Sequence, residues 1–219
     1  VKHIGWKAMT SLDACISLLN SKVPEQRARG VSLLERGEFG SADSVKHIDA
    51  LLAALSHPLT EFNVAIRQNV LRVLPALLQR CGGSLRSSLD RVLPHLAERL
   101  VDADVQSRAY AARALHELVA NTRAAAAVGA LLAPTVLTKG ARVREMVFIF
   151  LCDVLHLTRG SVHADELAAA IASPKLLAAL LKCLDDPASG AGAATLALLQ
   201  RLHAVPSLTP RLRATLATA

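Results

Sequence analysis

Residue types that carry out chemistry in enzymes are present in this chain of 219 residues, but their spacing does not fit a catalytic or metal site. The eight histidines are scattered, without a HExxH motif, and neither a GxSxG motif nor a glycine-rich phosphate loop occurs. Asp102 and Asp104 precede an expected helix, where carboxylates commonly act as caps. We therefore expect no enzyme activity, no metal ion, no cofactor and no small-molecule substrate.

Four cysteines are widely spaced, and none belongs to a CxxC motif of the kind that binds zinc. They are Cys15, Cys81, Cys152 and Cys183, and three of them lie in apolar helical runs. Buried thiols in a reducing compartment explain this pattern better than disulfides do. The apolar runs are too short to cross a membrane, and the first residues lack the apolar run of a signal peptide. We expect a cytoplasmic protein that does not contact a membrane.

The charged residues are more informative, because the chain has a formal net charge of +7 and a pI near 9.7. This balance suits an acidic protein or a nucleic acid as partner. Aromatic residues make up only 3% of the chain, which argues against stacking on RNA bases and makes nucleic acid the weaker alternative. Lys139 and Arg142 share one expected loop, where they are either solvated turn residues or contacts to an acidic partner.

The loop residues belong to a pattern that recurs about every 40 residues. Each copy has an apolar helix, a short polar loop and a second helix that begins on a valine or small residue. The pattern can be followed at Val23, Val64, Val105, Val143 and, less clearly, Ser189, with steps of 41, 41, 38 and 46 residues. Such periods are typical of HEAT and armadillo arrays, in which helix pairs stack to bury faces that one pair cannot bury alone.

Composition supports this interpretation. Hydrophobic residues make up 52% of the chain and are mainly leucine and alanine, which favour helices. A β-sandwich or barrel would need more β-branched and aromatic residues. We predict an all-α fold, a HEAT-repeat α-solenoid of about five to six antiparallel helix pairs. The pairs should form a single domain over residues 1–219, monomeric in isolation, with 206–219 as a capping tail.

Hydrophobic periodicity and turn residues place the individual helices. Pro75 and Pro94 fall inside expected helices and predict kinks or breaks there. The segment 143–157 is apolar on most sides and should lie in the middle of the core, and Val105 should face inward. The expected helices are 7–19, 26–36, 45–55, 64–81, 85–100, 105–120, 123–137, 143–157, 165–172, 174–184 and 191–204.

The loops and the helices that follow them resemble TOG domains, the tubulin-binding HEAT modules of microtubule-regulating proteins such as the CLASP and crescerin families. The segment Lys139-Gly140-Ala141-Arg142-Val143-Arg144-Glu145 is similar to the fourth loop of those domains. Asp102-Ala103-Asp104-Val105, followed by Arg108, is similar to their third loop. The segment from Ser21 to Arg27 occupies the place of their first loop. The resemblance covers nearly the whole chain, although its motifs are short.

The resemblance implies a flat paddle whose intra-repeat loops line one narrow edge and contact tubulin. The family's first loop usually has a tryptophan where this chain has Val23, and its fifth loop usually has a basic residue, which is absent here. The tubulin-binding candidates that it implies are Lys22 and Val23 in loop one, Phe62 and Asn63 in loop two, Asp104 and Gln106 in loop three, Lys139 and Arg142 in loop four, and Ser189 in loop five.

Two groups of residues have structural alternatives. Phe62 is either an exposed anchor or ordinary packing against the next helix, and packing is the preferred interpretation for Val23. Arginines recur just after the loops at Arg27, Arg67, Arg108 and Arg144. We expect them to form a structural ladder, with each guanidinium bonded to an Asp or a carbonyl of a neighbouring repeat, rather than a basic stripe.

Two functions follow from these features. The first is a non-catalytic TOG-like module that contacts αβ-tubulin through its intra-repeat loops and acts in microtubule regulation. The second is a cytoskeletal or ciliary HEAT scaffold that binds another protein and not tubulin, and the differences in loops one and five favour it. Both imply a place on the cytoskeleton, at a microtubule, centrosome or cilium.

Overall fold

The computed structural model describes residues 11–36, 41–81, 89–158, 162–184, 190–205, 208 and 210, and this part of the chain is helical without β-strands. The helices are α1 (Ser11–Leu19), α2 (Pro24–Arg36), α3 (Ser41–Leu59), α4 (Val64–Cys81), α5 (Leu89–Arg99), α6 (Val105–Asn121), α7 (Ala124–Leu131), α8 (Pro134–Leu137), α9 (Ala141–Leu157), α10 (Val162–Ile171), α11 (Pro174–Leu181) and α12 (Ala191–His203).

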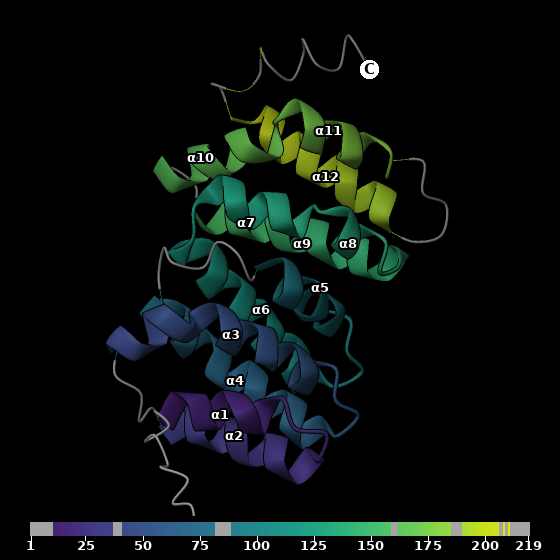
Figure 1. Ribbon diagram of the computed structural model, residues 1–219. Coiled ribbons are helices and arrows are strands. Elements are labelled where there is room, and N and C mark those ends of the chain that lie inside the picture. The colour runs from purple at the N-terminus through teal and green to yellow at the C-terminus, as the bar shows by residue number, and fades with distance from the viewer. Residues whose placement is uncertain are drawn as a thin grey trace, which may run out of the picture.

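The helices stack as antiparallel pairs along a rod, as the periodicity predicts (Figure 1). One layer holds the first helices of the repeats, α1, α3, α5, α7 with α8, and α10 with α11. The other layer holds the second helices, α2, α4, α6, α9 and α12. This is the predicted all-α HEAT-type solenoid, with five helix pairs in the described residues.

The core is a continuous strip of leucine, valine and alanine between the two layers. Its largest fully buried side chain is Phe148 in α9, and Val143, Val147, Leu151 and Val154 of the same helix are also buried. The prediction that segment 143–157 lies in the core is therefore confirmed. Burial of each such aliphatic or aromatic side chain contributes about 1.5–3 kcal/mol.

Packing between neighbouring repeats is not uniform. In the second layer, α4 packs closely on α6 and α9 packs closely on α12, whereas α6 and α9 are farther apart. The rings of His116 in α6 and Phe150 in α9 meet across this junction, with centroids 4.8 Å apart. The two halves of the rod are joined mainly through α5, which contacts α7, α8 and α9.

Several predicted helix ends were wrong, mostly at prolines. Helix α3 begins at Ser41 and runs through Pro58 to Leu59, because a proline in the last turn removes only one backbone hydrogen bond. Pro75 and Pro94 do not break α4 and α5, which are continuous there, so that of the two expected outcomes only a kink stays a prediction. Helix α10 begins at Val162, three residues before the expected start at residue 165.

The expected helix 123–137 is instead two helices. Ala133 between α7 and α8 has extended dihedral angles, φ −65° and ψ 148°, because the proline that follows disfavours the helical conformation. Helix α4 has the predicted bounds, Val64 to Cys81.

Candidate functional site

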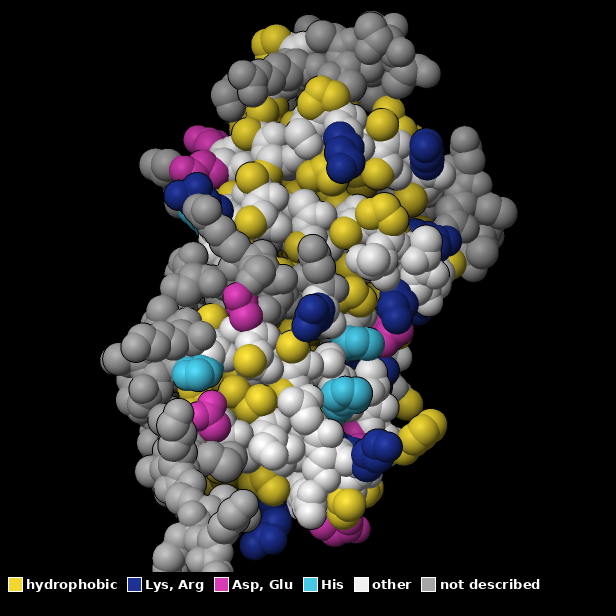
Figure 2. Space-filling model, viewed as in Figure 1, with side chains coloured by type: hydrophobic (Ala, Val, Ile, Leu, Met, Phe, Trp, Pro, Cys, Tyr) yellow, Lys and Arg dark blue, Asp and Glu magenta, His cyan; other side chains and the backbone are white. Residues whose placement is uncertain are grey.

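The intra-repeat loops 20–23, 60–63, 100–104 and 138–140 lie on one long edge of the rod, at the right in Figure 1. Figure 2 shows hydrophobic and basic side chains together along the same edge. Loops one to four therefore have the arrangement that the resemblance implies. Ser189, the candidate from loop five, lies outside the described residues.

In each of the first four repeats, an arginine in the second helix is hydrogen-bonded to the loop that precedes that helix. Its guanidinium donates to a backbone carbonyl six or seven residues earlier, which fixes the loop against the first turns of the helix. The four bonds are Arg27 Nη1 to Ser21 O at 2.7 Å, Arg67 Nη1 to Glu61 O at 2.6 Å, Arg108 Nη1 to Asp102 O at 2.7 Å and Arg144 Nη1 to Leu137 O at 3.0 Å.

The first three loops are also bonded to one another. Arg27 donates from Nε to Glu61 Oε2 in loop two at 2.7 Å, and Arg67 forms an ion pair with Asp102 in loop three, with Nε and Oδ2 3.1 Å apart. Gln68 donates to Asp104 Oδ2 at 2.7 Å, a second link between repeats two and three. The predicted arginine ladder is confirmed at these links.

Asp102 is the most buried carboxylate of the ladder. Burial alone would raise its pKa, but a hydrogen bond from the Asp104 amide, together with the charges of Arg67 and Arg99, lowers the pKa below its ordinary value. Arg99 Nη1 donates to Asp102 Oδ2 at 2.9 Å. The carboxylate therefore stays ionised and joins two helices and a loop.

In loop four the carbonyl that accepts from the arginine belongs to Leu137, which lies seven residues before Arg144 instead of six. The Leu137 side chain cannot accept from an arginine of the preceding repeat. Arg108, the arginine in that place, donates to carbonyls of its own loop instead. Among the first four loops, which the structure describes, the carboxylate links thus join loops one, two and three but not loops three and four.

In loops one and two the candidate residues are mostly exposed. Lys22 is exposed and Val23 is 44% exposed, while Phe62 is 96% exposed and does not fold back on α4. The packing alternative for Phe62 is therefore wrong, and the preference for packing at Val23 is wrong as well. Asn63 is exposed, but its Oδ1 accepts from the Ala65 amide at 3.0 Å and so caps α4.

Loop three contains one exposed candidate and one structural residue. Gln106 is exposed, whereas Asp104 caps α6 by accepting from the Ser107 amide at 2.6 Å. That hydrogen bond, followed by the one from Gln68, lowers the pKa of Asp104. Val105, expected to face inward, is 66% exposed. Val105 is the first residue of α6, and the buried residues of this helix begin only at Ser107.

Both basic candidates of loop four are paired within the chain. Lys139 Nζ is 3.0 Å from Glu98 Oε1 in α5, and Arg142 Nη1 donates to Glu145 Oε2 at 2.7 Å. Gly140, the residue before α9, has φ 143°, a conformation that favours glycine. Glu145 also approaches Gly190, where a Cβ atom would lie 2.5 Å from Oε1.

Sequence reasoning missed the exposed Val105 and the role of Glu98, which has a weak sequence signal because it lies inside a helix. Within the described residues we find no cluster of histidine, cysteine or acidic side chains suited to a metal ion. None of the helices there has the length and hydropathy needed to span a bilayer. The edge thus has the character of a binding surface, with exposed apolar residues on a braced backbone.

No protein-family model and no curated protein matches the chain. Solved structures do. The structure described in "TOG-tubulin binding specificity promotes microtubule dynamics and mitotic spindle formation" has a TM-score of 0.70 at 15% identity, covering 91% of this chain and 79% of that chain. The structure from "Crescerin uses a TOG domain array to regulate microtubules in the primary cilium" has a TM-score of 0.70 at 20% identity, covering 93% and 85%.

The MAST/Orbit N-terminal domain is a third similar structure, with a TM-score of 0.61 at 21% identity, covering 94% of this chain and 90% of that domain. At these identities the similarity concerns the fold. The chain has the fold of TOG domains, a helical solenoid of the HEAT type.

Proposed function

We propose that this protein is a non-catalytic TOG-like module that contacts αβ-tubulin through its intra-repeat loops and takes part in microtubule regulation. The chain acts as one domain, on the cytoskeleton. The observation that carries this proposal is the apolar tip of loop two on the shared edge, where the Phe62 side chain is 96% exposed. Microtubule-related structures with the same fold support tubulin as the partner.

The geometry of Phe62 suits an anchor residue. Arg67 donates to the carbonyl of Glu61 at 2.6 Å and to that of Phe62 at 3.4 Å, so the backbone under the ring is held before binding. Preorganisation of this kind reduces the entropy that binding must overcome. Val23 and Val105 add apolar surface on either side along the edge. Aromatic anchors at the centre of an interface contribute about 2 kcal/mol or more.

The test is gel filtration and affinity measurement with soluble αβ-tubulin. Phe62→Ala should weaken binding by about thirtyfold, which corresponds to about 2 kcal/mol. Leu157→Ala is the matched control, because Leu157 is 70% exposed and lies at the end of α9, away from the loops. A native protein that does not bind tubulin, or a Phe62→Ala variant that binds as well as the control, contradicts the proposal.

A scaffold that binds another protein and not tubulin is the second candidate. It is favoured by loop four, where Glu98 and Glu145 already pair with Lys139 and Arg142. If tubulin uses these cations, reversal of both to glutamate abolishes co-elution. Tubulin binding that survives the double reversal excludes loop four from the interface, and a pull-down that recovers a different protein without tubulin supports the scaffold.

A further inference from the structure

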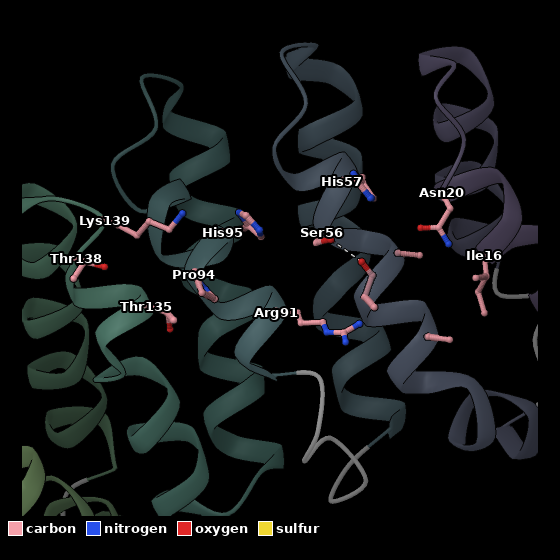
Figure 3. A pocket seen from close by; sticks show the side chains of 13 residues that line it. Ile16, Asn20, Ser56, His57, Arg91, Pro94, His95, Thr135, Thr138 and Lys139 are labelled. Carbon is pink, nitrogen blue, oxygen red and sulfur yellow. Dashed lines mark hydrogen bonds between the residues drawn. The ribbon is translucent and has the colours of Figure 1, made fainter.

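A groove of about 910 Å³ crosses the layer of first helices, beside the loop edge. Its walls come from four successive repeats, with residues of α1, α3, α5 and α8 and of the loop after α8. Figure 3 shows these helices side by side with their lining side chains. The groove therefore runs along the rod, across the helices, and presents a surface different from the loop tips.

One polar or basic side chain per repeat forms a row along the groove. In Figure 3 the row consists of Lys139, His95, His57 and Asn20, each near the loop end of its repeat. Thr138 and Ser56 lie just beneath the row and carry hydroxyl groups. A row of this kind can bind an elongated ligand that contacts each repeat in turn.

The floor of the groove is shallow and made of small side chains. Helix α3 contributes Ala50, Ala53 and Ala54 to the lining. Alanines at these positions leave room between α1 and α5, and an extended backbone could lie there without displacing a larger side chain.

The charge of the lining has one sign. Arg91 and Lys139 are cationic, and the lining residues that the structure describes include no aspartate or glutamate. Arg91 is exposed, and we find no ion pair for it among the described side chains. Glu98 is the nearest acid that the groove residues contact, with its carboxylate 3.0 Å from Lys139 Nζ and 3.6 Å from His95 Nδ1. The acid occupies the place that an incoming carboxylate would take.

The spacing of the row selects an extended ligand. Packed helices lie about 8–10 Å apart, and a chain in the extended polyproline II conformation rises about 3.1 Å per residue with three residues per turn, so that every third side chain lies on the same face. An acidic side chain at every third residue would therefore meet one repeat after another. We propose that this groove binds an extended acidic peptide segment of a partner protein, independently of the loop tips. Arg91 and Lys139 bind its carboxylates, and the Asn20 amide and the hydroxyl groups bind its backbone.

The probe is a fluorescein-labelled peptide of about nine residues, with glutamate at every third position and serine or glycine between. Binding is followed by fluorescence anisotropy at about 0.15 M salt, where weak surface attraction is screened. Arg91→Glu should weaken binding about tenfold, because it places a like charge opposite the ligand. Glu98→Gln should tighten binding about threefold, because it releases Lys139 and removes a competing carboxylate.

Lys175→Glu is the matched control, since Lys175 is an exposed cation in α11, in the same layer but outside this groove. It should bind the peptide like the native chain, and so should Phe62→Ala. Circular dichroism checks the fold, and Arg91→Gln replaces Arg91→Glu if the reversal unfolds the protein.

Three results would overturn the proposal. One is the absence of binding by the native chain, and another is an equal loss in Lys175→Glu and Arg91→Glu. The third is a single-stranded RNA of similar length that binds as tightly and is lost in the same variant, because the surface would then attract any polyanion. Loss of tubulin binding in Phe62→Ala, with the peptide still bound, separates this proposal from that for the loops.

Discussion

Loops one to three and loop four share an edge but are held there in different ways. Between the first three, Glu61 and Asp102 each accept from the arginine of the preceding repeat. Loop four is linked to the preceding repeat by the Lys139–Glu98 ion pair instead. The side chains of the Arg67–Asp102 pair are 10% and 4% exposed, against 33% and 25% for Lys139 and Glu98.

The second layer changes at the same place. Helices α6 and α9 are farther apart than their counterparts on either side, and a cavity of about 180 Å³ lies between them, lined by His116, Val119, Val154 and Leu157 among others. The missing carboxylate link thus coincides with looser packing in the second layer, while α5 still packs on α7 and α8 in the first layer. The comparison shows that the loops of one solenoid can differ in how they are linked. Largely buried ion pairs join loops one, two and three, whereas loop four is linked to the preceding repeat by the more exposed Lys139–Glu98 pair.

The largest loss in the free energy of unfolding is expected from Asp102→Asn. Removing the charge leaves Arg67 and Arg99 without their shared carboxylate in a buried site, and such changes cost about 3–5 kcal/mol. Urea denaturation measures the free energy of unfolding. Asp153→Asn, at an exposed position in α9, is the control and should stay within about 0.5 kcal/mol of the native chain. Equal losses in both variants would mean that the ladder does not brace the first three loops.

A smaller effect is expected at the first link of the ladder. A double-mutant cycle with Arg27→Gln and Glu61→Gln should give a coupling energy of about 1–2 kcal/mol, because both side chains are largely buried. The matched pair is Arg72 and Glu35, which also joins two repeats but whose side chains are 54% and 29% exposed. Its cycle should give only about 0.2–1 kcal/mol. A larger coupling energy for Arg72 and Glu35 than for Arg27 and Glu61 would contradict the conclusion that the ion pair between the loops is the stronger link between these repeats.

The smallest change in the free energy of unfolding is expected when the pH is lowered, through the histidines near the junction of the third and fourth repeats. Burial lowers the pKa of His95, opposed by Glu98 and assisted by Lys139, and burial also lowers the pKa of His116. In the unfolded chain these imidazoles gain protons as the pH falls below about 6.5, while the folded chain resists protonation. The free energy of unfolding should therefore fall between pH 7.5 and 5.5, and His95→Gln should fall less steeply. Identical slopes would show that His95 does not contribute.

Much of the fold could be predicted from local residue patterns. The polar loop that ends at Asn63 and the glycines that follow Cys81 gave the correct bounds of α4, and the recurrence of arginine after the loops predicted the links of Arg27 and Arg67 to the next repeat. Pro134 carried a signal for the break between α7 and α8, because the residue before a proline avoids the helical conformation. That signal was outweighed by the apolar periodicity of the segment 123–137.

The site was less predictable, because exposure and pairing depend on neighbours distant in sequence. Lys139 has the type and place of a free loop cation, yet Glu98, 41 residues earlier, binds it. Asp104 has the type of a contact residue and serves as a helix cap. The groove across the first helices arises from three alanines in α3 and from the stacking of four repeats, which periodicity does not reveal.

The lack of a carboxylate link between loops three and four, both of which the structure describes, has a mechanical consequence. The carboxylate cross-links between loops one, two and three stiffen that part of the rod against bending, and among the four repeats whose loops are described, bending is easiest where such a link is missing. Among these repeats, changes of curvature will therefore be concentrated between the third and the fourth. A ligand that contacts all four loops therefore has to fix the angle between the third and fourth repeats when it binds. A ligand that contacts only the first three loops binds a nearly rigid surface.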